Sequence, residues 1–367
     1  MEYDHNEVKK DLRFLLIIVL ALTLIGFIFI YSSSSVYAFE KFGSSFYFIK
    51  KQLLYLVPAI ISFFIFAAVP QNSLKKFTPL LFFLSLILTT LTLVSNMGLK
   101  LHGSSRWLIL GNFSLQPSEF LKLFLFLYIG YFIEKKKKKV KSLVHSYLPF
   151  LIILGITFLI LLKQPDFGSV ITIFSTALVL FFIANFNMIH LFSTVLLSIP
   201  AIIYLIYSKS YRLNRILIFL NPWADPKGSG FQIIQSLIAI GCGKFWGVGI
   251  SNSSQKFFYL PMQHTDFIFP IIAEEVGFVG SLVIIALYLM FLYFGVRIAL
   301  KLESDFAFFT TIGFVVLITI QAVINLMVSC GLLPTKGLGL PFISYGGSSL
   351  VAIFCMLGII ANFSNRN

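Results

Sequence analysis

The sequence predicts an all-α polytopic membrane protein, and three observations carry this prediction. The chain of 367 residues is 58% hydrophobic and includes 43 phenylalanines. Only 11% of its residues are charged, whereas about 25% is usual for a soluble domain. Its apolar residues form long continuous runs, unlike the short alternating stretches of a transmembrane β-barrel. Such a composition excludes a water-soluble enzyme, a DNA-binding protein and a disordered chain.

About ten segments are suited to crossing a bilayer, which takes roughly 20 mostly apolar residues. The first, at 14–32, is too long for a cleavable signal peptide, and Tyr31 with the four serines after it does not form a cleavage site. We expect residues 1–367 to form a single integral membrane domain. The predicted transmembrane helices lie at 14–32, 53–69, 78–95, 119–133, 147–162, 169–185, 188–207, 267–296, 306–330 and 346–363.

Lysine and arginine in the short loops set the orientation, because cytoplasmic loops are enriched in both. The strongest marker is the lysine run at 135–139, which Lys141 extends. With that loop in the cytoplasm, both termini also lie in the cytoplasm. The segment 208–266 then becomes a large extracytoplasmic loop between the seventh and eighth helices.

The predicted outer face is also strongly basic, which topology alone does not favour. Long translocated loops that ignore the charge rule are one explanation. The other is an anionic ligand on that side, for which a phosphate-bearing lipid headgroup is the obvious candidate. We therefore looked for candidate binding residues in the outer segments.

The large outer loop begins with Arg212 and Arg215. It continues into 230–241, where a helix would place Gln232 and Gln235 on one face and aliphatic side chains on the other. Such an amphipathic helix would lie on the membrane surface. The glycines that follow match neither a Walker loop nor a dinucleotide-binding fingerprint.

The end of the same loop carries Lys256, His264 and Asp266, next to the following predicted helix. Asp266 has two interpretations from its position: a helix N-cap, which is common for aspartate there, or a general base at the membrane surface. His264 is a competing base, although an interfacial histidine more often has a packing role.

Two shorter outer segments add charged candidates. Arg106 precedes a predicted helix start, and Glu119 and Lys122 are i,i+3 neighbours that can pair on one helix face. An ammonium inside a span is costly and marks either a functional site or a structural ion pair. Asp166 lies in the short turn at 163–168.

The last outer segment, 331–349, contains two clusters of glycine and proline, which indicate irregular backbone that must line a cavity or be covered by protein. It carries Lys336 and Ser348. The small residues at 346–349 also suit close helix packing.

Four motifs together make the chain resemble the SEDS family (shape, elongation, division and sporulation) over nearly its whole length. They are Gly-Phe-Gln-x-x-Gln-Ser at 230–236, Gln-Lys-x-x-Tyr-Leu-Pro at 255–261, His-Thr-Asp-Phe-Ile-Phe at 264–269 and Pro-Phe-Ile-Ser-Tyr-Gly-Gly-Ser-Ser at 341–349. The Leu-Pro-Thr-Lys-Gly-Leu stretch at 333–338 looks more like the cell-division branch than the side-wall branch.

The resemblance implies a peptidoglycan glycosyltransferase in the bacterial cytoplasmic (inner) membrane, at the division septum. The implied substrate is lipid II, and the implied partners are a class B penicillin-binding protein (an FtsI-like transpeptidase) and other divisome membrane proteins, with no nucleic acid. It also implies a divalent cation, Mg²⁺ or Mn²⁺, with unknown ligands and no organic cofactor. The family's essential aspartate falls on Asp266. Two positions depart from the family pattern: Met262-Gln263 replaces an expected acid, and Pro270 replaces a small residue.

The mechanism expected from the resemblance is an inverting displacement. Asp266 would accept the proton of the acceptor sugar hydroxyl, and the departing pyrophosphate needs no protonating acid. The predicted substrate-binding residues are Arg106, Glu119, Lys122, Asp166, Arg212, Arg215, Gln235, Lys256, His264, Lys336 and Ser348. Two alternatives stay open from the sequence: a lipid II flippase, and a non-catalytic scaffold that recruits the penicillin-binding protein.

Overall fold

A computed structural model describes residues 5–93, 98–101, 104–110, 113–255 and 263–366. Within these ranges the chain forms twelve α-helices and one three-stranded sheet. The helices are α1 (His5–Phe42), α2 (Tyr47–Ala68), α3 (Gln71–Leu91), α4 (Pro117–Lys136), α5 (Leu148–Lys163), α6 (Phe167–Ile183), α7 (Met188–Tyr207), α8 (Ser210–Leu220), α9 (Phe231–Cys242), α10 (Ile268–Leu300), α11 (Asp305–Ser329) and α12 (Gly347–Asn365).

The predicted fold class is confirmed. In the described part of the chain, eight helical segments have the length and apolar composition of a membrane span. They are α1, α2, α3, Leu143–Lys163 (which includes α5), α7, α10, α11 and α12. Two more predicted segments coincide with α4 and α6. Helix α6 is shorter, and α4 carries charges that lower its apolar character.

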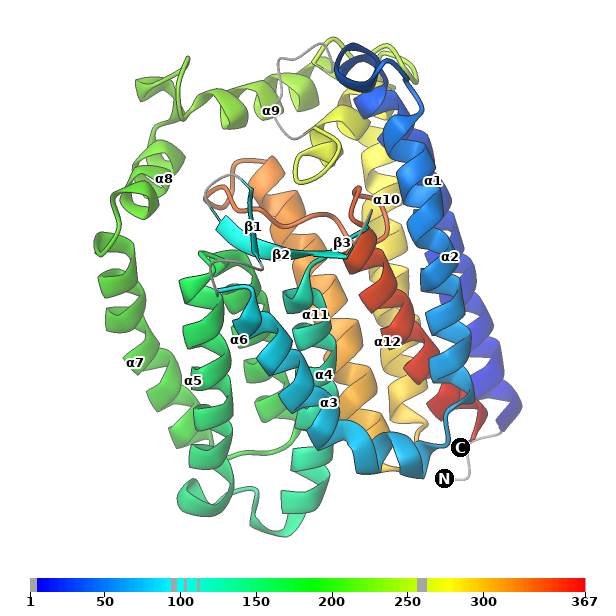
Figure 1. Ribbon diagram of the computed structural model, residues 1–367, viewed down its shortest axis with the longest axis vertical. Helices are drawn as coiled ribbons and strands as arrows, with labels where there is room; N and C mark the ends of the chain where they lie inside the picture. The colour runs from blue at the N-terminus through cyan, green and yellow to red at the C-terminus, as the bar shows by residue number, and fades with distance from the viewer. Residues whose placement is uncertain (1–4, 94–97, 102–103, 111–112, 256–262, 367) are drawn as a thin grey trace.

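Burial shows how the helices are arranged. The apolar windows of α11 and α12 are 78% and 83% buried, so these two helices form the centre of the bundle. Helix α7 has no buried residue in its window and lies at the periphery (Figure 1). Helix α1 packs along α10, and α2 packs along α12. The close α2–α12 contact requires a glycine, because a Cβ at Gly358 would lie 2.4 Å from the carbonyl oxygen of Phe63.

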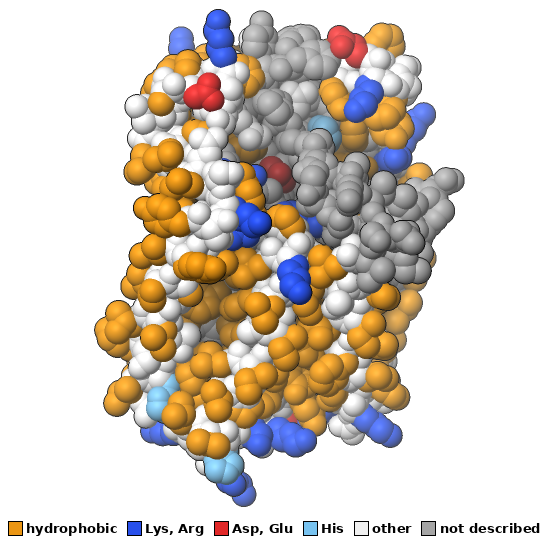
Figure 2. Space-filling view, turned by 60° about the vertical axis from the view of Figure 1, so that its left-hand side comes forward, with side chains coloured by type: hydrophobic (Ala, Val, Ile, Leu, Met, Phe, Trp, Pro, Cys, Tyr) orange, Lys and Arg blue, Asp and Glu red, His pale blue; other side chains and the backbone are white. Residues whose placement is uncertain are grey.

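The two ends of the bundle differ. Both chain termini lie at one end, while α8, α9 and the sheet lie at the other (Figure 1). Figure 2 shows basic side chains at both ends and also near mid-height of this face, with a band of hydrophobic side chains between those at mid-height and those at the lower end, as expected for a protein that crosses a bilayer. The side of the membrane on which each end lies stays a prediction from the lysine distribution.

The segment before α4 contains strands, although none was expected there from the sequence. Strands β1 (Gly98–Leu101), β2 (Ser104–Leu110) and β3 (Phe113–Leu115) pair antiparallel in the order β1-β2-β3. The sheet contacts the start of α4 and of α12. The sheet therefore lies next to α4 and the central helix α12.

Helix α10 is interrupted at Gly277, whose backbone has φ 68° and ψ −164°. The loop 244–249 lies against this break, and the backbone N–H of Val248 donates to the carbonyl of Glu274 at 3.0 Å. The interruption therefore leaves backbone groups that the loop satisfies, as membrane-embedded backbone requires. It fixes the loop between α9 and α10 to the helix that follows Asp266.

Candidate active site

A cavity of about 620 Å³ opens at the end of the bundle that carries α8, α9 and the sheet. Its walls come from β2, the starts of α4, α6 and α12, helices α8 and α9, the turn before α10, and the segment between α11 and α12. The cavity gathers seven of the predicted site residues: Arg106, Glu119, Asp166, Arg215, His264, Asp266 and Lys336.

Asp266 lies in the turn before α10 and does not cap that helix. The cap position is Phe267, which makes no side-chain cap hydrogen bond. The backbone carbonyl of Asp266 accepts a hydrogen bond from Asn325 Nδ2 at 2.8 Å, and Asn325 also donates to the carbonyl of Leu338 at 2.6 Å. Asn325 thus joins the Asp266 turn to the segment after α11, and the Asp266 carboxylate is directed into the cavity.

The pKa of Asp266 is raised to about 6, chiefly by burial and also by nearby Asp166, while Arg106 and Arg215 act in the opposite direction. A carboxylate with this pKa is ionised at neutral pH and is a stronger base than an ordinary aspartate. The departure at Pro270 does not displace the helix start, because proline is tolerated in the first helical turn, where its missing N–H is not needed.

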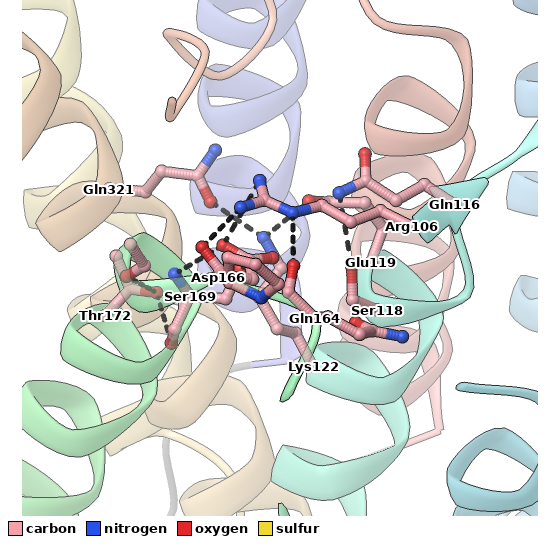
Figure 3. A network of polar contacts seen from close by, with 12 residues as sticks. Arg106, Gln116, Ser118, Glu119, Lys122, Gln164, Asp166, Ser169, Thr172 and Gln321 are labelled. Atoms are coloured by element: carbon pink, nitrogen blue, oxygen red, sulfur yellow. Dashed lines mark hydrogen bonds and ion pairs between the residues drawn. The ribbon is translucent and has the colours of Figure 1, made fainter. Parts of the chain in front are cut away.

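Arg106 is held in place by backbone and by an acid. Its Nε donates to the carbonyl of Gln164 at 2.8 Å, and its Nη2 donates to the carbonyl of Pro165 at 2.5 Å. Its Nη1 lies 3.9 Å from Asp166 Oδ1. Asp166 in turn accepts from the N–H and the hydroxyl of Ser169, at 3.2 and 2.8 Å (Figure 3). The guanidinium position is therefore fixed before any substrate binds.

Glu119 and Lys122 form the predicted i,i+3 ion pair at 2.8 Å. Lys122 is almost fully buried and also donates to Gln321 Oε1 at 3.2 Å. Gln321 Nε2 donates to the carbonyl of Gly339 at 3.0 Å. These contacts link α4 and α11 to the segment after α11, and Figure 3 shows Glu119, Lys122 and Gln321 together. Glu119 and Gln321 line the cavity, and Lys122 supports both from behind the lining.

Three further cations surround the cavity and its neighbour. Arg215 Nη1 donates to the carbonyl of Thr335 at 3.2 Å, which connects α8 to the segment that carries Lys336. Burial lowers the pKa of Arg215 and lowers that of Lys336 to about 8. Arg212 lines a second cavity of about 500 Å³, which shares Arg106, Arg215 and Lys336 with the first. Four basic residues of the segments that were predicted to lie outside, Arg106, Arg212, Arg215 and Lys336, thus lie around these two cavities.

His264 lines the cavity wall but is packed among aromatic rings. Its ring centroid lies 4.2 Å from that of Phe48 and 5.8 Å from that of Tyr345. Burial lowers the pKa of His264 to about 4, so the ring is neutral at physiological pH. These contacts support the packing interpretation of this residue more than the role of a competing base.

The other predicted residues have different places. Ser348 is buried beside the cavity, where its hydroxyl donates to the carbonyl of Ser114 at 3.2 Å and accepts from the N–H of Gln116 at 2.9 Å. Gln235 does not line the cavity, whereas Gln232 of the same helix does. Lys256 lies outside the described residues. Substrate binding by these three residues, as by all the other predicted residues, stays a prediction.

Gln321 and Asn325 were missed because both lie within an apolar segment. They are four residues apart on one face of α11 and bind the segment that forms the cavity wall. An amide inside a membrane span is costly without a partner, so the pair was a signal that the sequence offered.

Few side chains could bind the predicted divalent cation. Among the described residues, no group of three or more His, Cys, Asp and Glu side chains is suited to a metal ion. Mg²⁺ commonly takes only one or two protein carboxylates together with substrate phosphates. Asp266 and Asp166 are cavity carboxylates that meet this requirement.

A family model described as "Cell cycle protein" (FTSW_RODA_SPOVE) matches residues 12–367. The chain belongs to the FtsW/RodA/SpoVE family. Relatives in this family include a protein named probable peptidoglycan glycosyltransferase FtsW from Trichlorobacter lovleyi, which is 41% identical over 95% of this chain and 92% of that protein. Stage V sporulation protein E of Bacillus subtilis is 41% identical over 98% of each chain.

Solved structures of the FtsW/RodA/SpoVE family type share the fold. A chain described under "structural coordination of polymerization and crosslinking by a peptidoglycan synthase complex" superposes with a TM-score of 0.77, at 29% identity, over 95% of this chain and 96% of that one. The rod shape determining protein RodA of Thermus thermophilus superposes with a TM-score of 0.70, at 25% identity, over 95% of each chain. The helical architecture described above is therefore the architecture of this family.

Proposed function

We propose that this chain is a peptidoglycan glycosyltransferase that polymerises lipid II, with Asp266 as the general base. One observation carries the proposal: a carboxylate with a raised pKa faces a cavity that is ringed by cations. The names of the FtsW relatives support the same reaction class. The alternatives of a flippase and of a scaffold have no specific observation in their favour.

The chemistry follows from the charges in the cavity. Asp266 accepts the proton of the acceptor hydroxyl as the oxygen attacks the anomeric carbon of the donor. The bond from that carbon to the pyrophosphate breaks, and the diphosphate leaves with the bonding electrons. Arg106, Arg215 and Lys336 stabilise the charge that develops on the leaving group. Because the diphosphate is already a good leaving group, one carboxylate suffices for a single inverting displacement.

The same proposal includes the setting of the enzyme. We place it in the bacterial cytoplasmic membrane with the cavity on the outer side, at the division septum, beside a class B penicillin-binding protein that would cross-link the new strands. The synthase complex among the structural relatives supports a partner of this kind. Asp166 or Asp266 would hold a Mg²⁺ or Mn²⁺ ion, which would add charge stabilisation for the diphosphate.

The test is a polymerisation assay with purified, partner-bound protein, a divalent cation and fluorescent lipid II. We expect Asp266→Asn to reduce glycan formation by at least about 100-fold, in the range of general-base removal. Asp225→Asn is the matched control, because this exposed acid lies in the same outer loop and bonds only within it. Full polymerisation by a folded Asp266→Asn protein would refute the proposed base and leave the scaffold interpretation.

A further inference from the structure

A third cavity lies at the opposite end of the bundle, beside the loop after α4. Its volume is about 670 Å³. Its rim carries four lysines of the run noted in the sequence: Lys137, Lys138, Lys139 and Lys141. These residues lie just beyond the C-terminal end of α4, whereas Glu119 and Lys122 of the active site lie near its start, and neither the proposed reaction nor the bundle core uses them.

The charge of this cavity is largely uncompensated. Lys137 Nζ pairs with Asp305 Oδ2 at 2.6 Å, and Asp305 is the one acid among the described lining residues. Within the described part of the chain, no acidic side chain pairs with Lys138, Lys139 or Lys141. The neighbouring acid Glu134 is paired with Lys75 at 2.5 Å and does not line the cavity.

The backbone that presents the lysines is ordered by its own hydrogen bonds. The carbonyl of Lys139 accepts from the N–H of Ser142 at 2.9 Å and from the hydroxyl of Ser146 at 2.7 Å. The Ser142 hydroxyl also accepts from the N–H of His145 at 3.3 Å. The rim is therefore a turn that is held by its own hydrogen bonds, and its lysines extend from an ordered backbone.

The floor of the same cavity is apolar. It is formed by Ile133 of α4, Val140 of the turn after α4, Ile183 and Ala184 at the end of α6, and Phe309 of α11. Next to it, Val144 and Phe182 expose 65% and 60% of their surfaces, which places this region at the edge of the hydrophobic band. A basic rim above an apolar floor at the bilayer boundary matches a lipid that has a phosphate headgroup and acyl chains.

We propose that this cavity binds the headgroup of an anionic phospholipid. The lysines contact the phosphate, and the apolar floor contacts the glycerol and the first acyl carbons. Asp305 competes with the lipid phosphate for Lys137, because the ammonium group of Lys137 cannot pair fully with both anions at once. The site is separate from the proposed reaction, so its test does not depend on polymerisation.

The experiment titrates the full-length protein in detergent with phosphatidylglycerol, phosphatidylcholine and glycerol 3-phosphate, and native mass spectrometry measures the bound fraction. We expect phosphatidylglycerol to bind at least about tenfold more tightly than either other probe, since each nearby lysine favours anionic headgroups. The triple variant Lys138→Gln, Lys139→Gln, Lys141→Gln should lose about tenfold in phosphatidylglycerol affinity. The control triple variant Lys9→Gln, Lys10→Gln, Lys76→Gln removes the same charge elsewhere and should bind normally.

A second variant is expected to increase the affinity for phosphatidylglycerol, and misfolding cannot produce such a gain. Asp305→Asn frees Lys137 and should tighten phosphatidylglycerol binding about threefold, since one acid is removed from the rim, whereas Glu134→Gln should not change it. Equal binding of phosphatidylcholine, equal loss in both triple variants, or no gain in Asp305→Asn would overturn the proposal. Glycerol 3-phosphate binding as tightly as phosphatidylglycerol would also overturn it, because the ligand would then be a soluble phosphate.

Discussion

Asp266 is positioned through its backbone, while its carboxylate faces the cavity. Its carbonyl is bound by Asn325, and no side-chain hydrogen bond of a helix cap engages it. This arrangement separates the two roles that the sequence left open at this position. An aspartate that capped α10 would share its charge with backbone N–H groups, which lowers a pKa. Here burial acts in the other direction.

Lys336 provides a prediction for alkaline pH. Its pKa is lowered to about 8 by burial, so the lysine loses its charge, and its attraction for a diphosphate, as the pH rises through 8. We expect kcat/KM of lipid II polymerisation to fall above this pH. In Lys336→Arg the fall should disappear below pH 9, because arginine keeps its charge. An unchanged alkaline midpoint in this variant would show that another group is responsible.

At the residue scale, much of the site was predictable because a charged side chain next to a membrane span has a high free-energy cost unless it is paired. Charged side chains next to membrane spans need a ligand or a partner, so Arg106, Glu119 and Asp166 were visible as candidates. Gln321 and Asn325 were overlooked because neutral amides change an apolar segment only slightly. The cavity is lined by Gln232 and not by the predicted Gln235. The sequence could not distinguish the two, because both lie on the polar face of the same helix.

Helix α10 illustrates what determines an element beyond its composition. Its apolar run continues through Gly277, so hydropathy predicts one uninterrupted helix. The interruption arises because the loop 244–249 supplies the hydrogen bonds that the broken helix loses. The sheet at 98–115 escaped prediction for a related reason: its strands are short, and they pair mainly with one another.

Gly277→Ala tests this interruption. A Cβ at this position would lie 2.3 Å from the backbone nitrogen of Gly247, and φ 68° is strained for alanine. We expect the substitution to lower the free energy of unfolding by about 2 kcal/mol. The apparent melting temperature in detergent should fall by about 4 °C or more. Gly155→Ala is the control: a Cβ at Gly155 meets no atom within 4 Å, and alanine favours a helix interior. Equal stability of the two variants would contradict the account.

At the scale of the whole molecule, the ten predicted segments and the grouping of both termini were predictable because the bilayer imposes length and composition. The arrangement of the helices was not, because lipid-facing and buried helices are similarly apolar. Helix α7, with no buried residue, and α11, which is mostly buried, could not be distinguished from their hydropathy.

The predicted orientation has a native reporter. Cys242 at the end of α9 is exposed, whereas Cys330 is half-buried and Cys355 is buried. We expect a membrane-impermeant maleimide to label Cys242 in cells once the outer envelope is permeable to the reagent, and the signal to vanish in Cys242→Ser. Labelling that requires disruption of the cytoplasmic membrane would place the cavity in the cytoplasm and reverse the predicted topology.

The central claim is that the Asp266 carboxylate removes the acceptor proton, and the pH dependence of single-turnover polymerisation tests it most directly. Because the base must be ionised and its pKa is about 6, the rate should be level near pH 7.5 and fall as the pH drops through 6. Well below that value the fall should approach tenfold per pH unit. A rate that stays constant from pH 7.5 to pH 5, in protein that stays folded, would contradict the claim.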